Sequence, residues 1–224
     1  RLALSNLSKY EESDRGFTSN TPPVLELSTS DIGQHQALIW DTELTWQKEH
    51  AYKRQLGAFE PQSTHLRVFL KYSTAFSGIL GSDLRYQKGL LGMSDRYEAR
   101  GLGQGSWLLS VGDFTQRDSL SVVDLQHFNG NRNVFNGFDE DGFQLLDYYR
   151  YSTSGFHLQG HVQHSLNPLE IGSYKLHLVL SMHYLHTASV DHIELAMGLK
   201  KLLKLWRVDF VASHTNGHID RAGI

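Results

Sequence analysis

The chain contains no cysteine, which excludes disulfide bonds, thiolate metal sites and cysteine nucleophiles. It has only 4 prolines, and no apolar run reaches the roughly 18 residues that a membrane-spanning helix needs. Neither sign of charge dominates: 21 Lys and Arg against 24 Asp and Glu give a formal net charge of −3, so nucleic acid is not an expected partner. No glycine-rich phosphate loop opens a helix, and nucleotide binding is unsupported.

The sequence is instead rich in residues that form strands and turns. Its 224 residues include 20 glycines and 11% aromatic residues. This length suits one all-β domain over 1–224. The sequence begins at Arg1 without Met and ends in RAGI, which reads like the first residues of another strand. A preceding domain and a final strand outside this sequence are therefore left open.

The clearest strand is YKLHLVLSMHYLH at 174–186. Every second position in it carries a large apolar side chain: Leu176, Leu178, Leu180, Met182 and Tyr184. A period of two over about eleven residues is typical of a tilted transmembrane strand, whereas a helix would scatter these leucines around its circumference. The alternation assigns His177 and His183 to the opposite face.

The same period recurs along the chain. It is clear in ALIWDTELTWQKE, HLRVFLKYS, FHLQGHVQHSL and HIELAMGLK, at 37–49, 65–73, 156–166 and 192–200. Weaker candidate strands lie at 24–28, 79–88, 92–100, 105–113, 119–127, 143–152 and 204–213. GLKKLLKLW at 198–206 is interpreted as a hairpin rather than a basic helix. The predicted fold is an antiparallel transmembrane β-barrel with about 12 strands visible here, complete or part of a larger barrel.

Strand length and aromatic placement favour this barrel over a soluble sandwich. Sandwich strands usually run about 5–6 residues, and several strands here alternate for ten or more. Large aromatic residues lie near predicted strand ends, where a bilayer interface would hold them. The candidates for such a girdle are Trp40, Trp46, Tyr148, Tyr184 and Trp206. The alternative is a soluble β-sandwich that binds a ligand, with these aromatic residues in its core.

The carboxyl-terminal half carries HFNGN (127–131), FQLLDYYRYST (143–153) and the closing pair IELAMGL and LWRVDFV. In these elements it resembles the barrel of an uncharacterised outer-membrane family of Bacteroidota, described as containing a carboxypeptidase-regulatory-like domain. That family is distantly similar to the BamA-like surface-antigen superfamily. The resemblance implies a Gram-negative outer-membrane protein, a non-enzymatic component of an assembly, export or uptake complex. Its partners would be the lipid bilayer, lipopolysaccharide, and other outer-membrane proteins or lipoproteins.

The same resemblance implies a loop inside the barrel lumen. In the superfamily an Arg-Gly-Phe loop folds into the lumen, and HFNGN occupies roughly its place here without that motif. The candidate loop residues are Phe128, Asn129, Gly130, Asn131 and Arg132. We expect Arg132 to pair with a carboxylate of the barrel wall, either Glu194 or Asp209.

The 13 histidines are the most suggestive chemical feature. The alternation and the expected loop pairing give these candidates for the lumen side: His157, His161, His177, His183, Glu194 and Asp209. We interpret the histidines as polar wall residues, since no helical ligand pair predicts a metal, and we expect no cofactor. A hydrolase with a rim site, built from Asp209 and His214 or from Asp191 and His192, is the alternative from another class. No nucleophile elbow supports it, so we predict that the chain is not an enzyme.

Overall fold

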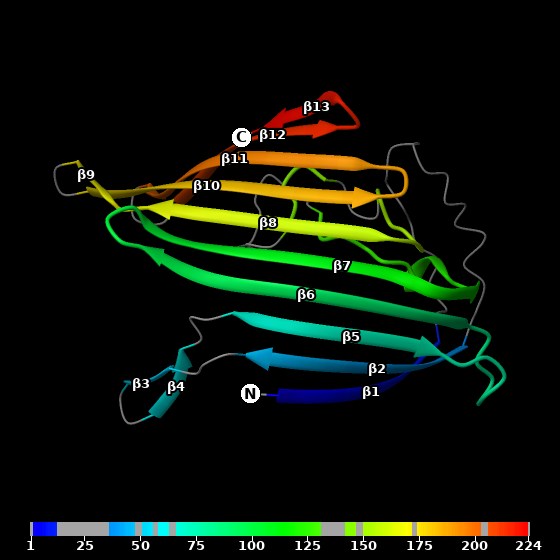
Figure 1. Cartoon of the computed structure of the whole chain (residues 1–224). Coiled ribbons are helices and arrows are strands. Elements are labelled where there is room, and N and C mark those ends of the chain that lie inside the picture. The colour runs from blue at the N-terminus through cyan, green and yellow to red at the C-terminus, as the bar shows by residue number, and fades with distance from the viewer. Residues whose placement is uncertain are drawn as a thin grey trace.

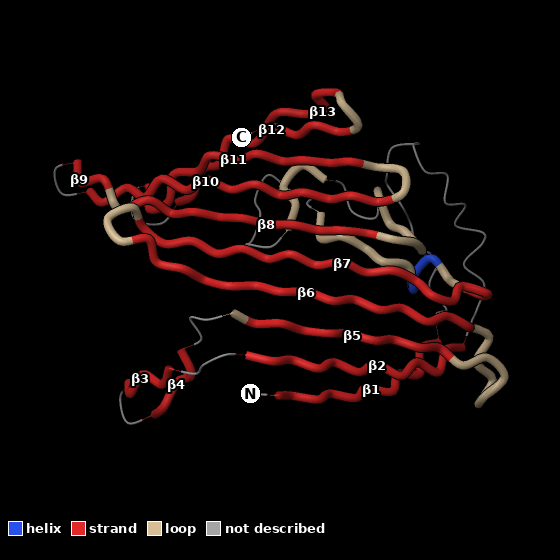
Figure 2. The backbone as a smooth tube through the Cα atoms, viewed as in Figure 1, coloured by secondary structure: helices blue, strands red, loops and turns tan. Residues whose placement is uncertain are grey.

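Strands make up nearly all of the regular structure. The computed structural model describes residues 2–12, 36–47, 51–55, 58–62, 66–130, 142–146, 150–171, 174–202 and 206–223. Within them the one short helix that Figure 2 shows is a 3-10 turn, Val122–Asp124. No helix in these ranges has the length and apolar character required to cross a membrane.

Eleven strands form one antiparallel sheet whose order nearly follows the chain (Figure 1). Its strands, in order across the sheet, are β1 (Leu2–Glu12), β2 (Gln36–Gln47), β5 (Arg67–Ala75), β6 (Arg85–Ala99), β7 (Gly103–Ser119), β8 (His157–Leu166), β10 (Tyr174–Thr187), β11 (Asp191–Leu202), β12 (Trp206–Thr215) and β13 (His218–Gly223). The eleventh, β9 (Leu169–Ile171), also pairs with β10. A separate hairpin, β3 (Ala51–Gln55) and β4 (Ala58–Gln62), lies between β2 and β5 in the chain.

The all-β, antiparallel prediction is confirmed. The described strands form one sheet and one hairpin, an arrangement unlike the two packed sheets of a sandwich. β1 and β13 are the two edges of this sheet, which is open between them. The interpretation of 198–206 as a hairpin agrees with the pairing of β11 with β12.

Two of the weaker predicted strands are wrong. Residues 119–127 contain the 3-10 turn, and the described part of 143–152 is irregular. Phe143 and Leu146 are apolar because they pack into a buried cluster with Phe128, not because they alternate across a sheet. The strand predicted at 79–88 begins only at Arg85, since Leu80 has a left-handed backbone (φ 51°) that a strand cannot contain. The candidate at 24–28 lies outside the described residues.

The two faces of the sheet differ in an unusual way. One face, which we name the apolar face, exposes large apolar side chains: Trp40, Leu44, Trp46, Leu70, Tyr72, Leu91, Met93, Leu109, Val162, Leu180, Met182, Leu195, Met197 and Phe210. The opposite face, which we name the polar face, buries His157, His161, Gln163, Ser181, His183, His192, Glu194 and Ser213. Globular proteins usually show the reverse distribution, with apolar side chains inside.

Candidate functional site

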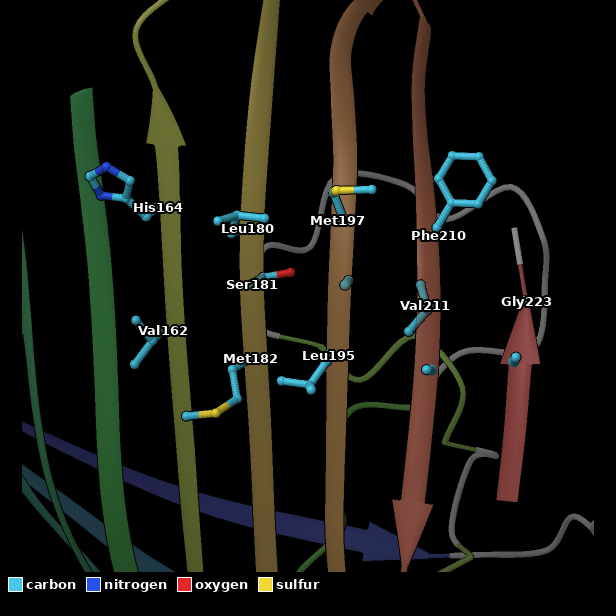
Figure 3. A pocket seen from close by; sticks show the side chains of 13 residues that line it. Val162, His164, Leu180, Ser181, Met182, Leu195, Met197, Phe210, Val211 and Gly223 are labelled. Carbon is cyan, nitrogen blue, oxygen red and sulfur yellow. The ribbon is translucent and has the colours of Figure 1, made fainter. Parts of the chain in front are cut away.

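The polar face is covered over β8 to β12 by the segment that joins β7 to β8. We name this segment, residues 120–156, the β7–β8 connection; its described parts are 120–130, 142–146 and 150–156. It lies on the side of the sheet away from the viewer in Figures 1 and 3. Its described residues form a network of hydrogen bonds with buried carboxylates of β11 and β12.

A fully buried carboxylate holds the connection. Glu194, on β11, has no exposed surface. Its two oxygens accept backbone hydrogen bonds from the amides of Gln144 (2.6 Å) and Leu145 (3.0 Å). The ring of His192 lies on the same strand, with Nε2 3.0 Å from the Glu194 carboxylate and Nδ1 2.8 Å from the Thr215 hydroxyl. Several donors around one buried carboxylate compensate the loss of water that burial of a charge requires.

A second carboxylate holds the same residue of the connection. Asp209, on β12, accepts hydrogen bonds from the Gln144 side-chain amide (3.1 Å) and from Nε of Arg207 (2.8 Å). Gly198 is its register partner on β11, and a Cβ atom there would lie 1.8 Å from Asp209 Oδ1. The missing side chain thus creates the space for Asp209. Gln144 bridges two strands, one through its backbone and one through its side chain.

An aromatic ring is wedged beside these carboxylates. Phe143, fully buried, lies 5.5 Å from the ring of His183 and 5.7 Å from the ring of His192, centroid to centroid. It packs in one cluster with Phe128, Leu146 and Leu185. The connection is therefore anchored by apolar burial and by charge-assisted hydrogen bonds at adjacent residues, Phe143 and Gln144.

Two histidines of the polar face stack directly on each other. His161 of β8 and His183 of β10 are register partners, and their ring centroids lie 4.3 Å apart with planes at 25°. His157, also buried, has Nδ1 3.1 Å from the Gly155 carbonyl and contacts the ring of Phe128 at 5.7 Å. His177 is only half-buried. These rings fill the space between strand and connection, and no group of three or more His, Cys, Asp or Glu side chains suited to a metal ion occurs in the described ranges.

The predicted lumen-loop residues are partly visible. Phe128 is buried, and the Asn129 carbonyl accepts a hydrogen bond from the Phe143 amide (2.8 Å), which ties the two parts of the connection together. Gly130 is half-buried, whereas Asn131 and Arg132 lie outside the described residues. The hypothesis that Arg132 binds Glu194 or Asp209 therefore stays a prediction.

Sequence reasoning selected these two carboxylates and missed the residues that the structure brings to them. Gln144 and Leu145 contact Glu194 through their backbone amides, which any residue carries. The sequence marks this segment only as a weak candidate strand at 143–152 and as part of FQLLDYYRYST, one of the elements that carry the family resemblance. The signal in the sequence that could have identified this segment as packed against the sheet is a group of apolar residues without the alternation of a strand.

The residue pairs considered for a hydrolase do not come together. Asp209 is bound to Gln144 and Arg207, and His214 is exposed on the opposite face of β12. At the β10–β11 hairpin, Asp191 forms two hydrogen bonds, one accepted from the Tyr184 hydroxyl (3.1 Å) and one with His186 Nδ1 (2.6 Å). Neither of these partners is His192. These two hydrogen bonds, that of His186 first, lower the pKa of the exposed Asp191 carboxyl. The cluster fixes the hairpin beyond the apolar side chains.

The proposed aromatic girdle is only partly described. Trp40 and Trp46 are exposed on the apolar face of β2. Tyr184 is half-buried near the β10–β11 hairpin. Trp206 opens β12, and its side chain, like the whole of Tyr148, lies outside the described residues.

The apolar face contains a shallow depression over β8 to β13. Figure 3 shows Val162, Leu180, Met182, Leu195, Met197 and Phe210 lining it. Small residues of β12 and β13, including Ala212 and Gly223, form its other border. Its lining is overwhelmingly apolar, in contrast to the polar face directly behind it.

Comparison with known protein families gives a match over most of the chain. Residues 1–199 match the model of a family described as the C-terminal domain of a family of unknown function, DUF5686. No curated protein and no solved structure matches the chain.

Proposed function

The chain belongs to the DUF5686 family, whose function is unknown, and we propose that it forms the wall of a β-barrel in a Gram-negative outer membrane. In this proposal it acts without catalysing a reaction, as a component of an assembly, export or uptake complex. Its apolar face contacts the acyl chains of the bilayer. Its polar face lines the lumen, and the β7–β8 connection occupies part of that lumen.

The single observation that carries this proposal is the inversion of the two faces. Leu195 is 56% exposed and Leu180 45% exposed, while Glu194, the neighbour of Leu195 in the chain, is completely buried. Soluble monomers rarely expose contiguous apolar patches on this scale. A bilayer would cover the apolar face, and the inward-facing polar side chains would need no contact with lipid.

The length of the strands also supports the proposed membrane barrel. β6 has 15 residues, β7 has 17 and β10 has 14. A tilted transmembrane strand needs about 9–11 residues, so these strands could cross a bilayer and extend beyond it. Closure would also be required, because an unpaired strand edge in hydrocarbon leaves backbone groups without partners. The barrel therefore includes strand pairing beyond that of the described sheet.

A fluorescence experiment tests the lipid contact. Because the chain has no cysteine, Leu195→Cys and Ala188→Cys each introduce a single labelling site without further mutation. Ala188 lies exposed in the β10–β11 turn and is the control. With an environment-sensitive dye attached and the chain folded into vesicles, lipids brominated along the acyl chain should quench Leu195→Cys and spare Ala188→Cys. Equal, weak quenching of both would contradict the proposal.

The role in a complex needs a separate test. Chemical cross-linking in outer membranes, followed by purification in detergent, should recover the chain with other outer-membrane proteins or lipoproteins. Recovery of the chain by itself at every cross-linker concentration would argue against a complex. Assays for lipase and protease activity on the same material would show whether the chain is an enzyme after all.

A further inference from the structure

Four buried imidazole rings lie between the sheet and the β7–β8 connection. Each is only 1–2% exposed, and they belong to His157, His161, His183 and His192. Phe128 of the connection contacts the ring of His157, and Phe143 contacts the rings of His183 and His192. Histidine is the side chain whose charge ordinarily changes between about pH 5 and 8. The surface that holds the connection is therefore built from groups that gain charge in mild acid.

The ring of His157 has no acceptor for a second proton. Its Nδ1 lies 3.1 Å from the Gly155 carbonyl, so Nδ1 carries the proton of the neutral ring. Its Nε2 is buried without a hydrogen-bond partner among the described residues, and a Cβ atom on Gly112 would lie 2.5 Å from it. A proton gained at Nε2 would be a buried donor with no acceptor, which is unfavourable while the connection covers the ring.

The stacked rings of His161 and His183 cannot both be charged without strong repulsion. Their centroids lie 4.3 Å apart, and neither ring has more than 2% of its surface exposed to water that would screen a charge. Phe143 covers His183 from the side of the connection. Charging of this pair therefore favours a state in which the connection no longer excludes water from it.

The supply of carboxylates beside the four rings is small. Glu194 is the register partner of His183 and contacts His192, but its oxygens also accept two backbone amides of the connection. Asp209, the second carboxylate that holds the connection, is paired with Arg207. One carboxylate without a permanent cation as its partner thus faces four rings, so protonation of several rings leaves positive charge uncompensated.

Other titratable and charged groups on the surrounding elements do not supply the missing carboxylates. Those described are Tyr86, Lys88, Asp113, Arg117, Asp124, His127, Arg150, Tyr151, His177, Lys200, Asp220 and Arg221. Asp220 is paired with Arg150, and Asp124 accepts a hydrogen bond from the Tyr86 hydroxyl. Asp113 and Lys88 act on the ring of His157 with opposite sign.

A chain of hydrogen bonds connects the buried rings with the rim of the sheet. Asp220, whose side chain is 26% exposed, accepts a hydrogen bond from the Thr215 hydroxyl (3.3 Å). The same hydroxyl lies 2.8 Å from His192 Nδ1, and His192 Nε2 lies 3.0 Å from Glu194. Protons from solvent therefore have a route to His192 while the connection is still in place.

We propose that the β7–β8 connection is released from the polar face in mild acid, with the buried histidines as the trigger. At neutral pH the uncharged rings pack against Phe128 and Phe143. When the connection is detached, water reaches the rings and they bind protons more readily, so a fall in pH shifts the equilibrium toward the detached state. The attachment exists whether or not lipid covers the apolar face, and this inference is therefore independent of the proposed barrel.

A distance measurement between two spin labels tests the release. The chain has no cysteine, so Asn129→Cys in the connection and Leu102→Cys in the turn at 100–102 introduce two labelling sites at exposed positions. In the full chain, folded in vesicles or detergent, double electron–electron resonance should give a narrow distance distribution at about pH 7.5 and a broader, displaced one at about pH 4.5, a range that includes the ordinary ionisation of imidazole. Identical distributions at both pH values would overturn the proposal. Loss of the strand signal in circular dichroism over the same range would also overturn it, because the sheet itself would then be unfolding.

Substitution of the rings tests whether histidines are the trigger. His157→Phe/His183→Phe keeps an aromatic ring against Phe128 and Phe143 and removes two titratable groups, so the midpoint of the release should move at least about one pH unit lower. His214→Phe/His218→Phe removes two exposed histidines and is the matched control, which should leave the midpoint unchanged. Equal midpoints in the two double variants would overturn the assignment to the buried rings. If the first variant is already detached at neutral pH, His157→Phe, which retains the His161–His183 stack, decides the point through a smaller shift in the same direction.

Discussion

Glu194 is the residue through which the β7–β8 connection is attached most directly. Its carboxylate accepts the amides of Gln144 and Leu145 and also contacts His192. In Glu194→Gln the side-chain NH2 would face a backbone N–H, and one donor would lose its acceptor. We expect the free energy of unfolding to fall by about 2–3 kcal/mol, the usual cost when a buried hydrogen bond to a charged group is lost. Denaturant unfolding and proteolysis of the connection would measure it.

Glu43→Gln is the control for that substitution. Glu43 is a partly exposed carboxylate that contacts Arg67 and Lys71, and exposed ion pairs contribute about 0–1 kcal/mol. Its loss should leave proteolysis of the connection unchanged. Equal effects of the two substitutions would mean that Glu194 does not hold the connection.

Gly198 is the second residue whose replacement should act on the connection. A Cβ atom there would lie 1.8 Å from Asp209 Oδ1, so Gly198→Ala must displace the carboxylate that accepts the Gln144 side chain. We expect a loss of about 1–3 kcal/mol, as for other overpacked buried sites. Gly89→Ala, where no atom lies within 4 Å of the new methyl group, is the matched control and should be close to neutral. Thermal unfolding of both variants in parallel decides the point.

At the scale of the strand, β11 offers the sharpest test of what covers the apolar face. Leu195→Lys places a charge on that face. In a bilayer it should destabilise the folded chain by about 2–4 kcal/mol near the midplane. For an exposed position in water the expected change is within about 0.5 kcal/mol. Folding titrations into vesicles would measure it, with Ala188→Lys at the exposed turn as the reference; a neutral Leu195→Lys would indicate that lipid does not contact this strand.

The strands were predictable from sequence because their alternation is local. In β10 the period of two alone separates Leu180 from His183, and the structure places these side chains on opposite faces. The β7–β8 connection was not predictable, because Phe143 and Gln144 owe their positions to residues about fifty places further along the chain. The role of Gly198 was hidden for the same reason: only the register reveals that Asp209 lies opposite it.

At the scale of the whole molecule, the longest connection between strands of the sheet marks one of its ends. The β7–β8 connection leaves the end that also carries the 76–84 turn and the short turns at 188–190 and 216–217. The other end carries the short turn at 100–102, the stretch at 167–173 and the 48–66 connection with the β3–β4 hairpin. Outer-membrane barrels carry long loops outside the cell and short turns in the periplasm. We therefore expect the end with the β7–β8 connection to face the exterior.

Two exposed leucines at opposite ends of β6 report this orientation. Leu80 lies in the 76–84 turn and Leu102 in the 100–102 turn. An impermeant maleimide added to intact cells should label Leu80→Cys, and should label Leu102→Cys only after the outer membrane is permeabilised. The opposite pattern would reverse the orientation, and labelling of both in intact cells would contradict a membrane-spanning sheet.

The near-sequential order of the sheet has a consequence for the time course of folding. Successive strands from β10 to β13 are joined by short turns, so each pairing closes a small loop at little entropic cost. The attachment of the connection is far less local, with Gln144 separated from Glu194 by 50 residues and from Asp209 by 65. Its binding surface exists only once β8, β10, β11 and β12 are paired. We therefore expect the sheet to form first and Phe143 to enter its place between the two histidines in a later, slower phase.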